Sequence, residues 1–483
     1  MTELKDKIAN GKLARLGLLD DAGVDAAVDL VGTIAASGIE TVRVLFADQH
    51  GVLRGKTIVA SAMSSVLADG IAAPSTLLFK DTSNRTVFPV WSNDLGPDAS
   101  NAADILLAPD AATFRVLPWS PKSAWLFCDP YYKSGAPIPF SPRGTLKEAM
   151  TRLGARGLTM VVGLEVEFHV YERVDTKLDH ADAEMPGAPV TTRNLGQGYQ
   201  FLAETQFDQL EWIMDELRRD AQALGLKVRS TEVEMGPSQF EFTFDPADPL
   251  THADNMMMFR AMVKETCARK GLHATFMCRP KLENAAASGW HLHQSICDAE
   301  TGENLMIPSD EGAISDVASA WIAGLLEHAK ASCLITTPTV NGYKRYRPHQ
   351  LAPDRIQWGR DNRGAMIRAL MLPGDGASRI ENRVAEPAAN PYYFFASQIL
   401  AGLDGIENDM RAPDPVENPY TSDAEALPES LLSAIQHFEQ SEFFRKTLGD
   451  AFVTYLATVR RAEWQRYHLA ISQWEQAEYF NLY

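Results

Sequence analysis

Six side chains that can bind metal ions lie on four strand-like segments of the chain, and each segment repeats the same two-residue step. Successive side chains of a strand point to opposite faces, so this step collects charged side chains on one face. Burying such a face is costly unless opposite charge compensates it. The pattern therefore predicts a charged sheet face that binds metal ions and an anionic substrate. The six candidates are Glu165, Glu167, Glu234, Glu241, His291 and Glu381, on segments 163–170, 234–244, 290–295 and 379–383.

The types of these ligands indicate which metal they would bind. Carboxylate oxygens favour Mg²⁺ or Mn²⁺, whereas a zinc site would be richer in Cys and His. Ions of this kind suit phosphoryl transfer, because they neutralise phosphate charge. The chain lacks the GxxxxGK[ST] motif, so we do not expect a P-loop enzyme. A single Glu would ordinarily be a solvated surface acid, but that interpretation does not suit six residues in one pattern.

Longer motifs surround these residues, and together they resemble the glutamine synthetase family. They occur in the family's order with near-family spacing, and the resemblance covers nearly the whole chain. The motifs are Gly163-Leu-Glu165-Val-Glu167, Glu234-Met-Gly236-Pro-Ser-Gln239-Phe-Glu241, Ser288-Gly289-Trp-His291-Leu-His293, Asn341-Gly-Tyr-Lys-Arg345, Asn362-Arg363 with Arg368, and Arg379-Ile-Glu381-Asn-Arg383. Any one of them is weak alone, whereas six in order leave little room for chance.

The resemblance implies an α+β fold with two domains. Residues 1–140 would form a helical lead-in, over 1–37, and an N-terminal β-grasp domain. Residues 141–483 would form the catalytic domain, an antiparallel sheet half-barrel with flanking helices that binds ATP, metal and glutamate. Six prolines between residues 118 and 142 predict a linker between the domains. Sequence patterns predict strands at 41–46 and 52–59, and helices at 143–156, 207–224, 254–270, 313–333, 393–409 and through most of the chain from 428.

The resemblance also implies a role for each site residue. One ion would bind Glu167, Glu234 and Glu241, and the other would bind Glu165, His291 and Glu381. ATP would contact His293, Ser295 and Arg368. The catalytic residues would be Arg345 and Arg383, which hold the glutamate carboxylate or the transferring phosphate, and Arg363, which approaches the acyl phosphate. The remaining substrate contacts would be Glu234, Tyr199, Gly289, Trp290 and Leu351. Arginine suits this work, because its planar fork binds carboxylate and phosphate with two hydrogen bonds. Surface ion pairs for single arginines, and a buried structural role for His293, stay open as alternatives.

The chain departs from the family where ammonia-using members bind ammonium. Their mobile flap carries an acid six positions after the arginine matched by Arg345, and here that position is Leu351. Asp354 lies nearby, so a shifted flap acid stays open. Their second acidic contact is also missing, because residues 71–78 read Ile-Ala-Ala-Pro-Ser-Thr-Leu-Leu. The sequence therefore indicates a pocket with less charge and more hydrocarbon.

A pocket of this kind suits an amine bulkier than ammonia, since burying carbon gains about 25 cal/mol per Å². Ser238 in place of a family glycine, and Ala286-Ala287 in place of Asn-Gly, also alter the substrate pocket. We therefore predict ATP-dependent ligation of an alkyl or aryl amine to the γ-carboxylate of glutamate, through γ-glutamyl phosphate. The alternatives are an ordinary glutamine synthetase that uses ammonia and a non-catalytic family member. The second alternative is disfavoured, because a non-catalytic protein has no need of five converging carboxylates.

Cofactors, partners and location follow from the resemblance and from composition. The resemblance implies two or more Mg²⁺ or Mn²⁺ ions per site, ATP as co-substrate and a homo-oligomeric ring, with a dodecamer as the expected state. A net charge of −18 and a pI of about 5.1 argue against nucleic acid or an anionic membrane as a partner. The five cysteines contain no CxxC pair and indicate reduced thiols rather than a zinc site or disulfides. With neither a basic and apolar leader nor a run of 18 apolar residues, we expect a cytoplasmic enzyme.

Overall fold

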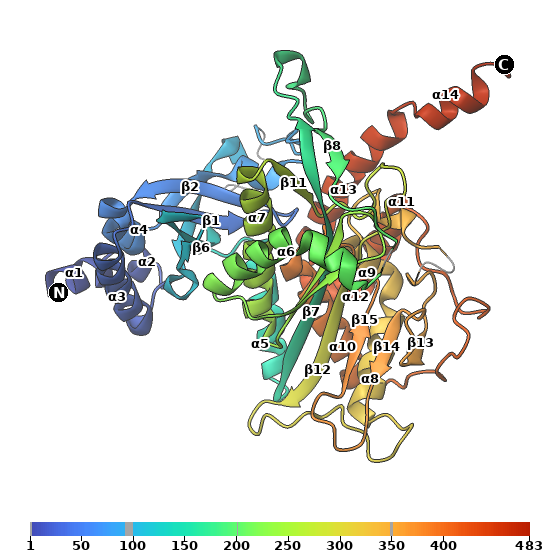
Figure 1. Ribbon diagram of the computed structural model, residues 1–483. Helices are drawn as coiled ribbons and strands as arrows, with labels where there is room; N and C mark the ends of the chain where they lie inside the picture. Colours follow the sequence, from blue (N-terminus) through green and yellow to red (C-terminus); the bar gives the residue numbers. More distant parts are fainter. Residues whose placement is uncertain (1, 92–99, 200, 348–350) are drawn as a thin grey trace.

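The computed structural model describes residues 2–91, 100–199, 201–347 and 351–483. Its N-terminal part, on the left in Figure 1, adjoins a larger part that is built around one long strand. The helical lead-in predicted for residues 1–37 is confirmed as α1 (Thr2–Ala9), α2 (Lys12–Arg15) and α3 (Asp21–Ser37). Asp20 caps α3, since its side chain accepts a hydrogen bond from the Gly23 N–H group.

The N-terminal part contains a sheet with one parallel pair of strands. Its elements are β1 (Thr41–Ala47), β2 (Leu53–Val59), α4 (Met63–Asp69), β3 (Ile71–Pro74), β4 (Asp104–Pro109), β5 (Arg115–Leu117) and β6 (Ser120–Tyr132). The strand order is β2-β1-β6-β4-β3, with β5 added on β6. β1 and β6 are parallel, and the other neighbouring strands are antiparallel. The strands predicted at 41–46 and 52–59 are therefore confirmed as β1 and β2.

The linker predicted between residues 118 and 142 is wrong, because β6 occupies its first half and is a central strand. Pro121 precedes the part of β6 that pairs with β1, and Pro130 lies beyond that part, opposite Leu107 of β4. A proline lacks the N–H group needed for a ladder hydrogen bond, and it is tolerated at a strand start or where one side is unpaired. The proline count therefore misled the prediction.

The larger sheet carries most of the residues that were predicted to do chemistry. Its strands are β7 (Leu158–Asp175), β8 (Thr191–Asn194), β9 (Val228–Val233), β10 (Gln239–Phe244), β11 (Leu272–Thr275), β12 (Trp290–Asp298), β13 (Trp358–Arg360), β14 (Ile367–Leu370) and β15 (Arg379–Asn382). Their order is β13-β14-β15-β12-β7-β10-β9, and β8 and β11 also pair with β7. Every pair is antiparallel except β13 with β14, so the predicted antiparallel character of this sheet is largely confirmed.

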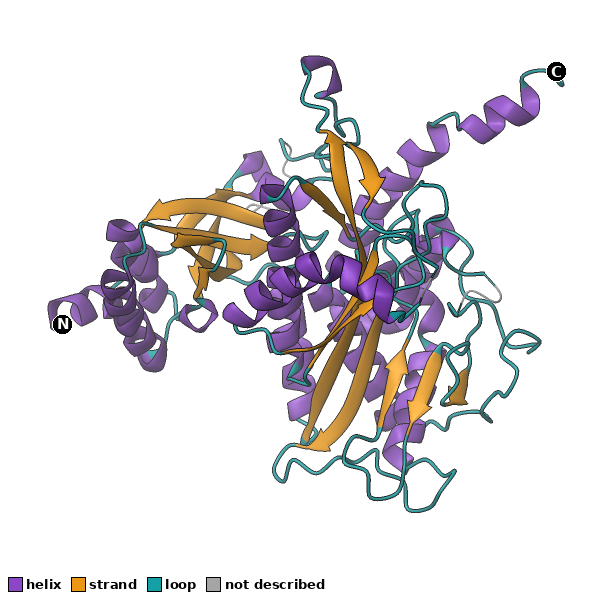
Figure 2. Cartoon of the chain, viewed as in Figure 1, coloured by secondary structure: helices purple, strands orange, loops and turns teal. Residues whose placement is uncertain are grey.

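Helices surround both sheets, while long loops gather beside β13 and β14 (Figure 2). The helices predicted after residue 142 are confirmed, with shifts of a few residues at their ends. They are α5 (Pro142–Gly154), α6 (Glu204–Ala223), α7 (Pro249–Arg269), α8 (Asp316–Glu327), α9 (Ala329–Thr336), α10 (Pro391–Glu407), α11 (Leu431–Gln440), α12 (Glu442–Leu448), α13 (Asp450–Leu469) and α14 (Gln473–Tyr479). Among the described residues, none of the helices is both long enough and apolar enough to cross a membrane.

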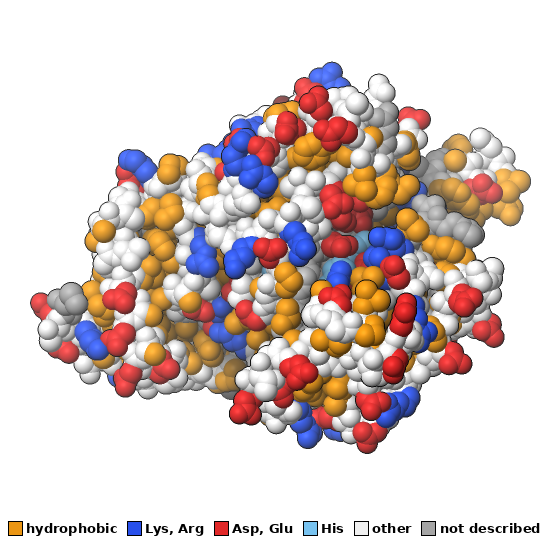
Figure 3. Space-filling model, turned by 60° about the horizontal axis from the view of Figure 1, so that its bottom comes forward, with side chains coloured by type: hydrophobic (Ala, Val, Ile, Leu, Met, Phe, Trp, Pro, Cys, Tyr) orange, Lys and Arg blue, Asp and Glu red, His pale blue; other side chains and the backbone are white. Residues whose placement is uncertain are grey.

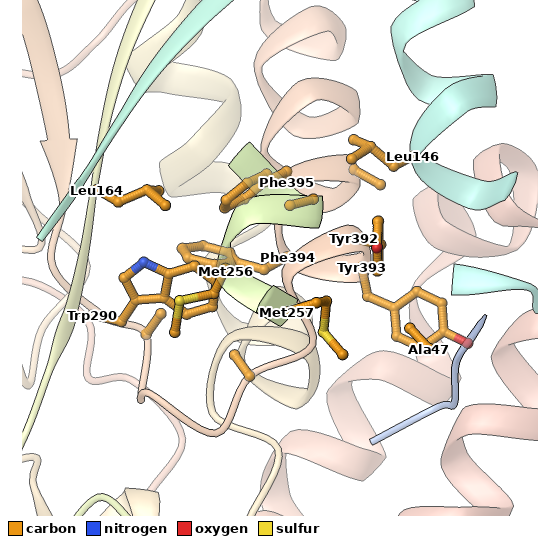
Figure 4. Packing of buried hydrophobic residues seen from close by; sticks show 14 of the residues in the cluster. Ala47, Leu146, Leu164, Met256, Met257, Trp290, Tyr392, Tyr393, Phe394 and Phe395 are labelled. Carbon is orange, nitrogen blue, oxygen red and sulfur yellow. The ribbon is translucent and has the colours of Figure 1, made fainter. Parts of the chain in front are cut away.

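The main core lies between the larger sheet and helices α7 and α10. Phe168 of β7 packs on Phe259 of α7, with ring centroids 5.7 Å apart. Trp290 of β12 meets Phe394 and Phe395 of α10 in the same way, as Figure 4 shows. The five cysteines are all buried and free. The core therefore fixes the central strands from behind.

Candidate active site

The register of the larger sheet brings charged residues of neighbouring strands directly opposite one another. Five strands contribute, in the order β10, β7, β12, β15 and β14. The opposed pairs are Glu241 with Glu167, Glu165 with His291, His293 with Glu381, and Glu381 with Arg368. The acids and histidines of these pairs are called the acid row from here on. Strand alternation was predicted to place them on one face, and the register now arranges them in one line across it.

The opposite face of these strands is apolar, as the two-residue step predicted. Leu164, Val166 and Phe168 alternate with the acids of β7, and all three are buried in the core. Because the back is packed and the strands are hydrogen-bonded on both sides, the acid row stands on a rigid support. Precise placement of this kind is what a catalytic group requires.

Glu234 is an exception to the predicted strand placement. The continuous strand expected over residues 234–244 is wrong, because β9 ends at Val233 and β10 begins only at Gln239. A turn that contains Gly236 and Pro237 separates them, and both residue types are typical of turns. Glu234 stays at the acid row nevertheless, since its backbone N–H group donates to the Gln239 carbonyl oxygen at 2.9 Å.

Glu165 lies at the centre of the acid row. One of its carboxylate oxygens lies 3.2 Å from His291 Nδ1, and the other lies 2.8 Å from His293 Nε2. His291 Nδ1 is also 3.5 Å from a carboxylate oxygen of Glu381. Ligand atoms within 4.8 Å of one another form two groups, Glu165 with Glu241 and His291, and Glu165 with His293 and Glu381. These groups differ from the two predicted trios, because Glu165 belongs to both and His293 joins one.

The acid row contains more negative charge than its surroundings balance. Burial, and then repulsion from Glu167, raise the pKa of Glu241 to about 10 and that of Glu234 to about 8. Burial would raise the pKa of Glu165 as well, but hydrogen bonds from His291 and His293 outweigh it and lower that pKa. These carboxylate oxygens and imidazole nitrogens could therefore hold a divalent metal ion, whose charge would satisfy the uncompensated acids.

Three arginines beside the acid row are buried, which argues against the surface ion-pair alternative for Arg345 and Arg383, whereas Arg368 also pairs with the exposed carboxylate of Asp361. Arg383 pairs with Glu381, and Arg368 Nη1 donates to the other oxygen of Glu381 at 3.0 Å. Arg345 Nη1 donates to the Arg383 carbonyl oxygen at 2.9 Å, and its Nη2 lies 3.5 Å from His291 Nε2. The fourth predicted arginine, Arg363, has an exposed side chain, and its carbonyl oxygen accepts from Arg383 Nε at 3.1 Å.

Gly289 leaves space for the Arg345 side chain. A Cβ atom at this position would lie 2.5 Å from Arg345 Nη2 and 3.0 Å from His291 Nε2, so a larger residue would displace the guanidinium. The Gly289 N–H group also donates to Glu167 Oε2 at 3.1 Å. The predicted substrate contact is therefore a residue that holds two site side chains in place.

The predicted ATP contacts on β12 differ in their surroundings. His293 is a buried member of the acid row, and its burial agrees with an ATP contact and with the structural alternative alike. Arg379 Nε donates to His293 Nδ1 at 3.0 Å, so His293 can present its Nε2–H group to Glu165. Ser295 lies further along the strand, where its hydroxyl donates to the Ser378 carbonyl oxygen at 3.0 Å.

Trp290 does not line the site, and its predicted role as a substrate contact is wrong. It neighbours His291 on β12, so strand alternation turns it to the apolar face. Its indole is fully buried and packs against Phe394, with ring centroids 5.2 Å apart, as Figure 4 shows. The same two-residue step that predicted the acid row could have excluded Trp290.

Two residues with no predicted role belong to the site. Gln239 is buried, and its Nε2 group donates to Glu167 Oε2 at 3.1 Å and to Ser288 Oγ at 3.0 Å. Glu232 lies opposite Glu241 on β9, and its charge contributes to the raised pKa of Glu241. The sequence did carry a signal for Glu232, because Glu232-Val-Glu234 repeats the spacing of the two acids on β7.

Leu351 and Tyr199 lie at the edges of the site. The Leu351 side chain is 49% exposed, and its carbonyl oxygen accepts from Arg383 Nη2 at 3.4 Å. Residues 348–350, which precede it in the predicted flap, lie outside the described residues. Tyr199 donates its backbone N–H to the Met235 carbonyl oxygen at 2.8 Å, next to Glu234. On the molecular surface, acidic side chains and a histidine meet in a hollow, with basic side chains beside them (Figure 3).

Comparison with known proteins adds to this geometry. Residues 139–479 match the family model described as "Glutamine synthetase, catalytic domain". The chain is 38% identical to a γ-glutamylanilide synthase of Acinetobacter sp, over 97% of this chain and 98% of that protein. It is 31% identical to a glutamine synthetase of Clostridium saccharobutylicum, over 94% and 98% of the two chains. The solved structure "GmaS/ADP complex-Conformation 1" is similar with a TM-score of 0.78 at 29% identity, over 94% of this chain and 99% of that one.

Proposed function

The chain belongs to the glutamine synthetase family, and from this premise we propose that it joins an amine to the γ-carboxylate of glutamate with ATP. The observation that carries the proposal is the acid row with its buried arginines, which brings carboxylate, imidazole and guanidinium groups to one face. A γ-carboxylate oxygen would attack the γ-phosphorus of ATP, and ADP would leave. The amine nitrogen would then attack the acyl carbon of γ-glutamyl phosphate, phosphate would leave, and the nitrogen would lose one proton.

Mg²⁺ or Mn²⁺, with two or more ions per site, would bind the acid row and Glu234. The raised pKa values of Glu234 and Glu241 support this assignment, because cation binding relieves repulsion between buried acids. Bound ions would supply positive charge for the ATP phosphates and the acceptor carboxylate. The chain's own part is to hold the ligands: strand pairing aligns the acids, and Gln239 and Gly289 fix Glu167.

The arginines would divide the anionic groups of the substrates among them. Arg345 and Arg383 are buried beside the acid row, so they would hold the glutamate carboxylate or the transferring phosphoryl oxygens. Arg368, with His293 and Ser295, would contact the ATP phosphates. Arg363 is exposed and linked to Arg383 through its carbonyl oxygen, so its guanidinium is available to the acyl phosphate.

We propose an alkyl or aryl amine as the acceptor. The position of an ammonium-binding acid is Leu351, and its backbone lies at the site through the hydrogen bond from Arg383. Identity to the anilide synthase, at 38%, also exceeds identity to the clostridial glutamine synthetase, at 31%. The latter resemblance keeps ammonia as a second candidate acceptor. A non-catalytic role is disfavoured, because uncompensated buried acids destabilise a protein that has no use for them.

The test is ADP release and amide formation by the full chain with glutamate, ATP and Mg²⁺. Ammonia, methylamine, butylamine, ethanolamine and aniline are offered singly, and products are identified by mass spectrometry. We expect γ-glutamyl amides from at least one alkyl or aryl amine, and no turnover after chelation. Glutamine as the best product would favour the second candidate, and the absence of ADP release with every acceptor would refute a ligase.

A homo-oligomeric ring, with a dodecamer as the expected state, is part of the proposal. Large apolar side chains near the C-terminus are exposed, at Leu469, Ile471, Trp474, Phe480, Leu482 and Tyr483. Helix α14 projects away from the body (Figure 1) and buries none of its residues, although so short a helix is marginal in water by itself. Contact with another copy would stabilise it. Light scattering should give a multiple of the chain mass, and removing residues 470–483 should lower it.

We also retain three broader assignments as proposals. The chain would divide near residue 140 into an N-terminal and a catalytic domain. The parallel pairing of β1 with β6 in an otherwise antiparallel sheet supports a β-grasp fold for the first domain. The five free, buried cysteines are compatible with the reducing cytoplasm.

A further inference from the structure

An apolar surface lies next to the acid row and has no part in the chemistry described so far. Phe201, Leu202 and Met235 are 52%, 55% and 45% exposed, and they are called the apolar shelf from here on. Met235 directly follows Glu234 in the chain. The Leu202 N–H group donates to the Val233 carbonyl oxygen at 3.2 Å, and the Tyr199 N–H group donates to the Met235 carbonyl oxygen at 2.8 Å, so the backbones of two separate segments lie side by side here. Neighbouring exposed apolar residues of this kind commonly mark a binding surface.

Ser238 holds the two segments of the shelf together. Its hydroxyl oxygen accepts hydrogen bonds from the N–H groups of Leu195, at 2.6 Å, and Gly196, at 3.4 Å. Gly198 packs so closely on Pro237 that a Cβ atom there would collide with the proline backbone. The loop of residues 195–199 is therefore pressed against the turn that follows Glu234.

The backbone of both segments is held in an unfavourable conformation. Tyr199, Leu202 and Ser238 have φ angles of 58°, 54° and 60°, in the left-handed region that side chains other than glycine rarely adopt. Strain of this kind persists where surrounding contacts enforce it, and it is common at binding sites. Here the enforcing contacts are the Ser238 hydroxyl and the hydrogen bonds of Tyr199 and Leu202 to β9 and the turn after it.

We propose that the apolar shelf binds the hydrocarbon part of the amine acceptor, and that Ser238 is the positioning residue that keeps the shelf in place. The inference rests on the proposed function and adds the acceptor class, a primary monoamine with an uncharged alkyl or aryl group. The shelf is continuous with Glu234, so an amine lying on it has its nitrogen towards the acid row and its carbons on the three apolar side chains.

The first experiment measures kcat/KM for methylamine, ethylamine, propylamine and butylamine. Complete burial of one methylene group should raise kcat/KM about fourfold, equivalent to ~0.8 kcal/mol. An open shelf covers only one side of the alkyl chain, so it gives part of this gain. We therefore expect the wild type to gain about twofold per methylene. Leu202→Ser and Met235→Ser should reduce this gain to nearly none, while the KM values for glutamate and ATP stay at their wild-type levels.

Two control variants separate loss of the shelf from loss of the fold. Met235→Leu keeps an apolar side chain of similar size and should keep the chain-length gain. Leu178→Ser removes another exposed apolar residue, 85% exposed between β7 and β8, and should leave every kinetic constant unchanged. An unchanged chain-length gain in both Leu202→Ser and Met235→Ser would overturn the proposal.

The second experiment concerns Ser238. If the shape of the turn were all that mattered, Ser238→Gly would have an amine KM no higher than that of the wild type, because glycine adopts a φ of 60° without strain. The proposal predicts the opposite. Both Ser238→Gly and Ser238→Ala remove the hydroxyl oxygen that accepts hydrogen bonds from Leu195 and Gly196. The amine KM should therefore rise about tenfold, and the chain-length gain should shrink. An amine KM at the wild-type level in Ser238→Gly would refute the positioning role.

The outcomes also separate this inference from the proposed function. If the wild type forms amides and the shelf variants keep the same chain-length gain, the ligase function would stand and the proposed role of the apolar shelf would be refuted. No amide formation with any amine would refute both. A fall in the native mass of Leu202→Ser or Met235→Ser without any change in amine preference would assign the shelf to a contact between copies, which counts against amine binding.

Discussion

Replacing Glu241 by Gln should stabilise the metal-free protein and weaken its response to metal. Burial and repulsion from Glu167 raise the pKa of Glu241 from an ordinary value of 4.5 to about 10. A carboxyl group of this kind favours folding while it is protonated. As the pH rises above about 4.5, the unfolded chain gains from ionisation while the folded chain does not, so stability falls until the pH reaches about 10.

The size of this destabilisation at pH 7.5 depends on how far that pH lies above the ordinary pKa of 4.5. One pKa unit corresponds to about 1.36 kcal/mol, and pH 7.5 lies about three units above the ordinary pKa of Glu241. Keeping Glu241 protonated in the folded chain therefore destabilises the fold by at most ~4 kcal/mol. Gln has nearly the same shape and no charge. For a catalytic domain of this size, removing that repulsion should raise Tm by about 5 °C in the presence of chelator.

Metal should reduce the difference in stability between the two proteins. A ligand at a hundred times its Kd stabilises the fold by about 2.7 kcal/mol, and the variant lacks one carboxylate ligand. Thermal unfolding is followed by calorimetry with chelator and then with excess Mn²⁺, at pH 5.5 and pH 7.5. Glu211→Gln, on the exposed face of α6, is the matched control and should change Tm little. A Glu241→Gln variant that is no more stable than the wild type at pH 7.5 with chelator would refute the reasoning.

Three further predictions concern catalysis. Glu167→Ala should abolish ATP turnover while circular dichroism stays unchanged, because it removes a ligand that Gln239 and Gly289 hold in place; retained ADP release would contradict the ligand assignment. Arg363→Ala should lose turnover more than ATP affinity, whereas Arg368→Ala should weaken ATP in calorimetry; equal loss of affinity in both would show that their roles are wrongly assigned. Ammonia should have a kcat/KM at least ~100-fold below that of the best amine, which requires about 2.7 kcal/mol of discrimination, and Leu351→Glu should shift the ratio towards ammonia. Equal wild-type efficiency with ammonia would count against the amine assignment.

The composition of the acid row could be predicted from the sequence, because strand alternation is a local property. Glu165 and Glu167 share a face of β7 whatever the rest of the fold does. Which acid faces which histidine is a different matter, because it depends on the register between strands far apart in the chain. The close approach of His293 to Glu165 and the dual role of Glu165 are consequences of that register.

Other differences between the predicted and the observed elements arose where the sequence held two conflicting signals. Gly236 and Pro237 marked the turn after Glu234, although the spacing of acids suggested one continuous strand. In β6 the reverse occurred, since prolines suggested a linker although the apolar residues between them formed a strand. The hydrogen bond from Leu195 to Ser238 could not have been predicted, because it joins segments more than 40 residues apart.

The separation between the acid row and the loops beside it bears on how such an enzyme could evolve. The row stands on strands that are paired on both sides, so nearly any change there disturbs several ligands together. The loop of residues 195–199 and the turn at Ser238 meet through a few hydrogen bonds at the edge of the sheet. Substitutions in these segments could exchange one acceptor for another while the phosphoryl-transfer machinery stays intact. Relatives that share this sheet could therefore diverge in nitrogen source through a handful of edge residues.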